Sequence, residues 1–274
     1  MKDLFEIAGG SVIGRHHRQS GRNNQDAFCI LPGNDSIIAV VTDGCGSSPG
    51  SEVGAKLGAQ LIANSLKRNL SLNISSTRYW DTVRLDVLRE LYWLTRPNPS
   101  GANRFIEDYG LFTAIAAVIH EDRLVIAAIG DGLIVCNDNY IALGPFSDNQ
   151  PPYIAYGLFQ PMDQRFMWQM KVQEKTAAIS HLLIATDGIG DYVAAANKIV
   201  PGQDREVGPL LNFWTEDRYF KNPDSVRRQL TLVNRDVSRP LWQESRMEVQ
   251  NGHLTDDTTL VVIRKVGPER RGIT

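Results

Sequence analysis

Aspartates in turns at the ends of short apolar segments are the feature that most constrains this chain. Five such turns occur, at Asn24-Gln25-Asp26, Thr42-Asp43-Gly44, Gly130-Asp131-Gly132, Thr186-Asp187-Gly188 and Thr255-Asp256-Asp257-Thr258. A single Asp-Gly after a strand is an ordinary turn, because both residues favour turns. Carboxylates gathered at one end of a sheet repel one another and are costly to bury, so five such turns predict that a cation neutralises them.

The apolar segments between these turns predict antiparallel sheets. Runs rich in Val, Ile and Ala have the length of buried strands at Ile37–Thr42, Phe112–His120, Leu124–Ile129, Ala177–Thr186 and Thr258–Arg264. Only three polar residues separate the second run from the third, which is the length of a hairpin loop and favours antiparallel pairing.

Helical periodicity predicts three helices, at Ser51–Leu70, Thr82–Leu94 and Asn222–Ser238. Between Leu143 and Gln173 the pattern gives way to Pro, Gly, Asn and aromatic residues, which is typical of a loop or flap over a surface. We expect one domain over residues 1–266 and a flexible basic tail at 267–274.

The bulk composition excludes several classes of protein. A formal net charge of −2 without a long Lys/Arg run argues against a nucleic-acid or membrane-surface protein, and no apolar run reaches the roughly 18 residues of a membrane span. Three cysteines without a CxxC pair favour neither a disulfide framework nor a zinc site, so a cytoplasmic location is expected.

A site made of carboxylates favours Mg²⁺ or Mn²⁺ over zinc, which prefers His and Cys ligands. Two such ions that share one carboxylate can hold a water between them, lower its pKa and aim it at a phosphorus atom. The pattern is therefore consistent with hydrolysis of phosphomonoesters without a covalent intermediate.

The order and spacing of these turns resemble the protein phosphatase 2C family of metal-dependent Ser/Thr phosphatases. The matching segments are GRNNQDAF (21–28), AVVTDGCGS (39–47), FTAIAAVI (112–119), AAIGDG (127–132), LLIATDGIGDYV (182–193) and DDTTLVVI (256–263). The resemblance implies an α+β fold, a four-layer α/β/β/α sandwich of two antiparallel sheets flanked by helices. It also implies two Mg²⁺ or Mn²⁺ ions per site, a possible third ion, and phosphorylated proteins as substrates.

The resemblance assigns a role to each acidic turn. Asp43 would bridge the two catalytic metals, Gly44 would supply a backbone carbonyl, and Asp187 and Asp256 would complete the ligands of one ion. Asp26 would orient metal-bound waters without binding the metal directly. Asp131 matches the position of a third metal in similar bacterial enzymes, and Asp191 would support that ion or its waters.

The sequence also departs from the family pattern. Similar enzymes bind the phosphate with an arginine five residues before the position of Asp26, and this chain has Gly21 there. Arg22 or Arg15 would therefore have to contact the phosphate instead. If the Arg15–Arg18 segment is a strand, His16 and His17 point to opposite faces and at most one faces a site.

Three further departures concern the metal end and the flap. Cys45 occupies the place where animal members carry a histidine, and Asp257 replaces the asparagine common in the final motif. The 143–173 segment lacks the usual Asp-His-Ser turn, which predicts a divergent flap and a divergent substrate.

Three functions remain open from the sequence. The first is an active protein Ser/Thr phosphatase, for which we expect a monomer without nucleic-acid or membrane partners. The second is a catalytically silent relative that binds phosphoproteins, although the complete set of Asp43, Asp187 and Asp256 argues against it. The third is a phosphatase for small phosphoesters.

Overall fold

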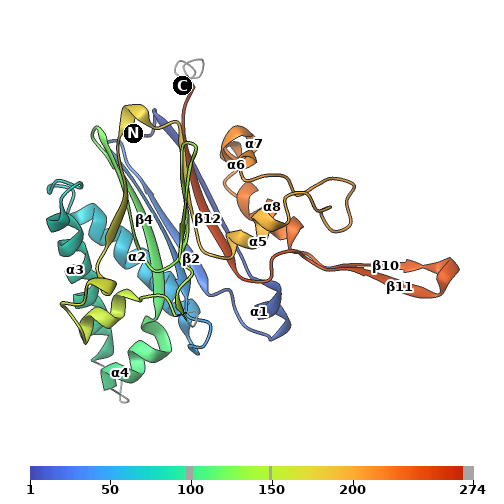
Figure 1. The fold of residues 1–274 in the computed structure, drawn as a ribbon, viewed down its shortest axis with the longest axis horizontal. Helices are drawn as coiled ribbons and strands as arrows, with labels where there is room; N and C mark the ends of the chain where they lie inside the picture. Colours follow the sequence, from blue (N-terminus) through green and yellow to red (C-terminus); the bar gives the residue numbers. More distant parts are fainter. Residues whose placement is uncertain (97–100, 148–149, 268–274) are drawn as a thin grey trace.

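The structure, a computed structural model, describes residues 1–96, 101–147 and 150–267 (Figure 1). Its strands are β1 (Phe5–Val12), β2 (Asp26–Pro32), β3 (Ser36–Gly44), β4 (Phe112–His120), β5 (Arg123–Ile129), β6 (Gly132–Cys136), β7 (Asn139–Leu143), β8 (Gln169–Lys175), β9 (His181–Ala185), β10 (Val237–Leu241), β11 (Arg246–Gln250) and β12 (Thr258–Lys265). Its α-helices are α1 (Arg15–Gln19), α2 (Ser51–Arg68), α3 (Thr77–Thr95), α4 (Gly101–Phe105), α5 (Ile189–Ala194), α6 (Asn212–Thr215), α7 (Arg218–Lys221) and α8 (Ser225–Val233).

Ten of these strands form two five-stranded antiparallel sheets. One sheet has the order β2-β3-β4-β5-β8 and the other β1-β12-β9-β6-β7. Strands β10 and β11 pair with each other as a separate two-stranded hairpin. Figure 1 shows the two large sheets stacked, with α2 and α3 on one outer face and α5 to α8 on the other. The expected four-layer sandwich is therefore confirmed.

Alternating side chains explain why the central strands are apolar on both faces. In β4, Ile115 and Ile119 point into the core between the sheets, whereas Ala116 and Val118 pack under α2 and α3. In β12, Val261 and Ile263 fill the same inter-sheet core, while Leu260 and Val262 face the helices of the other layer. Each of these strands is thus buried on both faces, because both faces of both sheets are covered.

Helix α2 lies close to its sheet because small residues line its inner face. Gly54, Ala55, Gly58 and Ala59 all lie on that face. A Cβ at Gly58 would come within 2.4 Å of the Phe112 ring, so this helix can approach β4 only with glycine there. The close packing sets the position of α2 against the sheet whose strand β3 ends with Asp43 and Gly44.

Several sequence predictions need correction in detail. The Arg15–Arg18 segment is not a strand but the short helix α1, so the argument from alternating faces does not apply to its histidines. The helix predicted at Asn222–Ser238 ends at Val233, and the chain then turns into β10. The Leu143–Gln173 segment is a flap as expected, with short 3-10 turns at Ile154–Leu158 and Gln164–Phe166, but its end already belongs to β8.

Two further predictions concern the C-terminal tail and the absence of a membrane span. Almost all of the tail predicted at 267–274 lies outside the described residues. Among the residues that are described, no helix is both long and apolar enough to cross a membrane.

Candidate metal centre and active site

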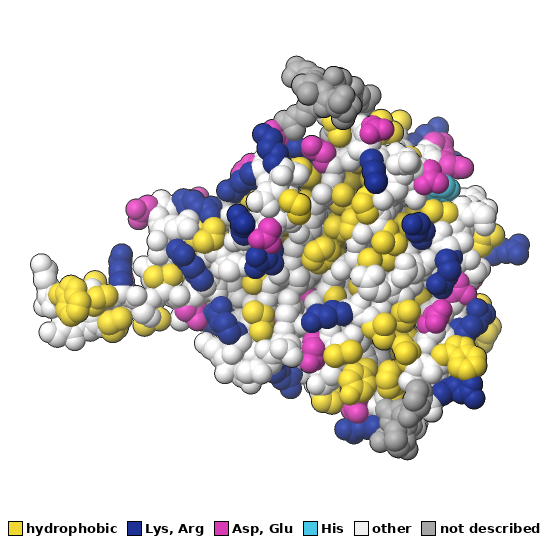
Figure 2. All heavy atoms as spheres, turned by 180° about the vertical axis from the view of Figure 1, so that it is seen from behind, with side chains coloured by type: hydrophobic (Ala, Val, Ile, Leu, Met, Phe, Trp, Pro, Cys, Tyr) yellow, Lys and Arg dark blue, Asp and Glu magenta, His cyan; other side chains and the backbone are white. Residues whose placement is uncertain are grey.

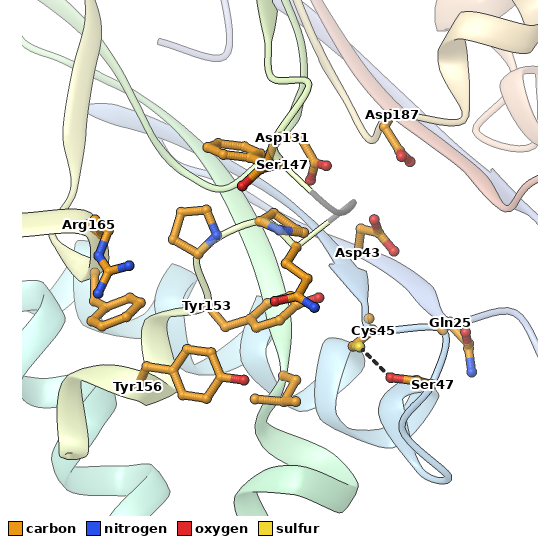
Figure 3. Close-up of a pocket in the computed structure, with 18 of the residues that line it drawn as sticks. Gln25, Asp43, Cys45, Ser47, Asp131, Ser147, Tyr153, Tyr156, Arg165 and Asp187 are labelled. Carbon is orange, nitrogen blue, oxygen red and sulfur yellow. Dashed lines mark hydrogen bonds between the residues drawn. The ribbon is translucent and has the colours of Figure 1, made fainter. Parts of the chain in front are cut away.

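The acidic turns converge on one cavity of about 780 Å³ at one end of the sandwich. Asp43 closes β3, Asp131 lies between β5 and β6, Asp187 follows β9, and Asp256 precedes β12, so both sheets contribute. Figure 3 shows the carboxyl groups of Asp43, Asp131 and Asp187 turned towards the same space. Residues up to 213 positions apart in the sequence, Asp43 to Asp256, thus line a single wall.

Asp26 lies directly behind this wall. It is 2% exposed, and it pairs with Asp43 across the β2–β3 ladder. Its Oδ2 accepts a hydrogen bond of 2.6 Å from the Thr186 hydroxyl, which in turn accepts a 3.0 Å hydrogen bond from the backbone N–H of Thr259. Asp26 is therefore anchored to the opposite sheet, and its position is fixed relative to both Asp43 and Asp187.

Crowding raises the pKa of each of these carboxyl groups above the ordinary aspartate value. Burial is the largest cause for Asp26 and Asp43, and repulsion from the neighbouring aspartates adds to it. Burial and the charges of Asp131 and Asp256 raise the pKa of Asp187 to about 6. The pKa values of Asp131 and Asp256 are raised as well, again mainly by burial.

This donor set fits a hard divalent cation. Four carboxylates line the cavity, and Oδ1 of Asp131 is buried without a hydrogen-bond partner in the described structure. Among the described residues that line the cavity, the only basic side chains are those of His17 and Arg165. A cation bound among the four carboxylates would relieve the repulsion that contributes to their raised pKa values.

Gly44 is held so closely that no side chain fits there. Its N–H donates to the carbonyl of Gln25 at 3.1 Å, and an added Cβ would lie 2.8 Å from the carbonyl oxygen of Ser51. The backbone at Gly44 therefore passes between the β2 entry and the first turn of α2. This packing restricts the backbone conformation at Gly44, and the role of its carbonyl as a metal ligand stays a prediction.

Asp191 is not among the described residues that line the cavity. Its carboxylate instead binds the loop that carries Asp256. Its Oδ2 accepts hydrogen bonds from the backbone N–H of Thr255 at 2.6 Å, from the Thr255 hydroxyl, and from the N–H of Asp256 at 3.3 Å. The carboxylate of Asp191 thus positions the backbone of Asp256. The sequence prediction that Asp191 supports a third ion stays a prediction.

Asp257 has a structural task that the sequence did not suggest. It is 2% exposed, and its two oxygens accept from the N–H of Gly14 at 2.6 Å and of Gln25 at 2.5 Å. Its Oδ2 also lies 2.9 Å from Nδ1 of His17, an ion-pair contact when the imidazole is protonated rather than a well-aligned hydrogen bond. Asp257 therefore joins the start of β12 to the segment that follows β1 and to the residue that precedes β2.

The two arginines expected to grip the phosphate lie outside the described lining of the main cavity. Arg22 donates to the carbonyl of Gly46 and borders two smaller neighbouring hollows. Arg15 does not line any of these hollows, and its Nε is buried without a partner in the described structure. His17 does line the main cavity and, together with Asp256 and Asp257, forms a cluster whose ligand atoms lie within 4.8 Å of one another.

The side of the cavity away from the carboxylates is built by the flap. Tyr153, Tyr156 and Phe166 line it together with Arg165, whose guanidinium is paired with Asp163 at 2.7 Å (Figure 3). Cys45 lies between the two sides, with its Sγ 3.1 Å from the Ser47 hydroxyl. Burial acts to raise the Cys45 pKa, but hydrogen bonds from Ser47 and Tyr153 outweigh it and lower that pKa below the usual thiol value.

Comparison with known proteins identifies the family. Residues 13–231 match the sequence model of the family described as protein phosphatase 2C. The chain belongs to the protein phosphatase 2C family. The match covers the turns at Asp26, Asp43, Asp131 and Asp187, and it ends before the hairpin β10–β11.

Solved structures of this family show the same fold. A bacterial serine phosphatase is 17% identical with a TM-score of 0.55, and the alignment covers 96% of this chain and 98% of that one. The serine/threonine phosphatase Stp1 from Staphylococcus aureus is 16% identical with a TM-score of 0.52, covering 96% of each chain. No curated protein sequence matches this chain significantly. At these identities the likeness establishes the fold, and the chemistry has to be argued from the site.

Proposed function

We propose that this protein phosphatase 2C family member is a divalent-metal-dependent phosphatase that hydrolyses phosphoserine and phosphothreonine in proteins. The observation that carries the proposal is the convergence of Asp43, Asp131, Asp187 and Asp256 on one cavity. A chain without a cation would gain stability by losing some of these charges, because each carboxylate raises the pKa of its neighbours. Their joint presence is best explained by metal binding.

The proposed ligands divide between two ions. Asp43 would bridge two Mg²⁺ or Mn²⁺ ions, the Gly44 carbonyl would bind one of them, and Asp187 and Asp256 would bind the other. Asp131 would serve a third, weaker ion. When bound, such ions lower the pKa of a coordinated water and neutralise charge on a phosphoryl group.

The remaining residues would position water and phosphate. The Thr186 hydroxyl already occupies Oδ2 of Asp26, which leaves Oδ1 as the acceptor for a water. His17 lies beside Asp256 and Asp257, and in its doubly protonated form it can donate to a phosphate oxygen through one ring nitrogen while the other, Nδ1, stays beside the Asp257 carboxylate. We therefore propose that His17, rather than Arg22 or Arg15, contacts the phosphate.

The cavity supports a protein substrate over a small one. Its volume of about 780 Å³ extends from the carboxylates to the aromatic side chains of the flap. A phosphoserine side chain would fill only the acidic end, whereas neighbouring peptide residues could lie against Tyr153 and Tyr156. This arrangement favours a peptide segment as the bound species.

The test is hydrolysis of p-nitrophenyl phosphate and of a phosphothreonine peptide by the purified protein, with Mn²⁺, with Mg²⁺ and with EDTA. We expect metal-dependent turnover of both, and loss of turnover to the EDTA level in Asp43→Ala. Asp122→Ala is the matched control, because Asp122 is an exposed aspartate in the β4–β5 turn. Peptide binding without turnover at any metal concentration would instead identify a silent phosphoprotein binder.

A further inference from the structure

The hairpin of β10 and β11 projects from the body of the molecule as an arm, defined here as residues 237–250. Figure 1 shows the arm extending to the right beyond the two sheets, and Figure 2 shows it from behind with hydrophobic side chains gathered at its end. Among the strands of the described residues, β10 and β11 pair only with each other. The arm lies beyond residues 13–231, the stretch that matches the family model.

The arm is firmly attached at its base. The Asp236 carboxylate pairs with Arg18 of α1 at 2.8 Å and accepts the N–H of Gly252 at 2.8 Å. Gln250, the last residue of β11, accepts the N–H of Gly202 at 2.8 Å. These contacts on both strands set the direction in which the arm leaves the body, so its tip is presented in a defined place.

The charged residues of the arm neutralise one another. Arg239 on β10 pairs with Glu248, its register partner on β11, and Arg246 pairs with Glu244 at 2.6 Å. The arm therefore offers no excess charge to an acidic or basic partner. A partner that binds the arm would therefore contact mainly its apolar side chains.

The most exposed apolar side chains of the arm lie on one face of its ladder, at Met247 and Val249, and in its turn, at Trp242. The register places Pro240 opposite Met247 and Ser238 opposite Val249, and cross-strand partners share a face of the ladder. Met247 and Val249 are each 56% exposed, and Trp242 in the turn is 85% exposed. Trp is the residue type most enriched among side chains that dominate binding energy, and a two-stranded hairpin is only marginally stable alone in water. A binding partner would cover this face.

The size and position of the arm indicate what kind of binding partner would cover its apolar face. A five-residue strand spans only about 17 Å, so the arm alone cannot bury the roughly 1,200 Å² or more that a stable interface needs. An arm-to-arm dimer would therefore be weak, and strand addition along β10 is disfavoured by Pro240. The partner has to contact the body as well. The body surface next to the base is α1, where Arg18 holds the arm and His17 lines the acidic cavity.

We propose that the arm is a docking site for folded phosphoprotein substrates. An apolar patch of the substrate would cover Trp242, Met247 and Val249 while its phosphorylated residue occupies the cavity. This inference rests on the proposed phosphatase function and adds a substrate class to it. Small phosphoesters and short phosphopeptides lack the folded apolar patch that would cover the arm, so we expect them not to benefit from it.

The experiment compares the wild-type protein with Trp242→Ser/Met247→Ser. The probes are p-nitrophenyl phosphate, the phosphoproteins of an ATP-depleted native extract of the source organism, and the tryptic phosphopeptides of that extract. Loss of phosphate is followed site by site by quantitative mass spectrometry, with Asp43→Ala as the blank. Trp93→Ser is the matched control, because Trp93 is 54% exposed and belongs to α3, a helix that lies on the opposite side of the body from the arm in Figure 1.

We expect the double variant to hydrolyse p-nitrophenyl phosphate and tryptic phosphopeptides at the wild-type rate. A subset of sites in the native extract should lose phosphate roughly tenfold or more slowly, while Trp93→Ser behaves like the wild type. Equal rates at every native site would overturn the proposal. It would also be overturned if sedimentation showed a wild-type dimer that becomes monomeric in the double variant. Absence of p-nitrophenyl phosphate turnover in the wild type would refute the phosphatase function itself, and the arm proposal with it.

Discussion

Asp26 and Asp43 face each other as register partners on β2 and β3, with Asp26 buried and Asp43 half-buried. Cross-strand partners have Cβ atoms about 5 Å apart, and like charges placed this way destabilise a sheet. Burial raises the pKa of both groups well above the usual range, and repulsion from Asp257 adds to it at Asp26 and repulsion from Asp26 adds to it at Asp43. The ionised forms of the two residues therefore destabilise the end of an otherwise apolar sheet. The carboxylates of Asp131, Asp187 and Asp256 lie at the same end.

Divalent metal should therefore stabilise the folded protein. A ligand present at about 100 times its Kd adds about 2.7 kcal/mol, which corresponds to a rise in Tm of about 5 °C or more for a chain of this size. Thermal unfolding with and without Mn²⁺ measures this rise. Asp43→Asn should raise the Tm of the metal-free protein and reduce the Mn²⁺ shift, whereas Asp122→Asn should change neither. An unchanged Tm in saturating Mn²⁺ and Mg²⁺ would contradict the metal centre.

The metal-free protein should lose stability as the pH rises. Asp187 has a pKa of about 6 in the fold against 3.8 for a free side chain, so the folded state binds more protons than the unfolded state between these values. Stability therefore falls as pH increases through about 4 to 6, and the neighbouring aspartates act in the same direction. Urea unfolding in EDTA at pH 4.5, 6 and 7.5 measures the slope. Asp187→Asn should flatten it, and a stability that rises with pH over this range would exclude the effect.

Gly44→Ala should damage the site far more than Gly46→Ala. A Cβ at position 44 would lie 2.8 Å from the Ser51 carbonyl and 2.9 Å from the Gln25 carbonyl, both in rigid backbone, whereas a Cβ at position 46 meets its nearest atom at 3.9 Å. We expect Gly44→Ala to shift the Asp43 turn and reduce kcat by about 10²-fold, since an error of about 1 Å in a catalytic group has effects of that size. Steady-state kinetics with p-nitrophenyl phosphate provides the measurement. Equal activities of the two variants would show that the turn is not held as described.

Asp257→Ala should affect stability and His17→Ala should affect turnover. Removing the Asp257 carboxylate leaves the buried N–H groups of Gly14 and Gln25 without acceptors, at about 1–3 kcal/mol each. His17 is 17% exposed and is held by a single ion-pair contact, so its truncation should leave the Tm nearly unchanged while lowering kcat/KM for phosphate esters. Unfolding and kinetics measured on both variants separate the two roles. A His17→Ala enzyme with wild-type kcat/KM would return the phosphate contact to Arg22 or Arg15.

Much of the architecture could be predicted from local sequence. The runs at Phe112–His120 and Thr258–Arg264 match β4 and β12 almost residue for residue, because a strand buried on both faces is a continuous apolar run. The weaker strands escaped detection. Strands β7, β10 and β11 are largely exposed and mix polar with apolar residues, so their sequence lacks a period that points to a strand.

The sequence by itself determined which residues could form a metal site and that they would lie at strand ends, because aspartates in turns after apolar runs are a local pattern. Only the tertiary structure decided which other groups surround them. It placed His17 in the cavity and Arg22 outside its described lining, made Asp257 a link between three strands, and turned 237–250 into a projecting arm. These outcomes depend on contacts between residues up to 243 positions apart, such as Gly14 with Asp257, and no local periodicity encodes such contacts.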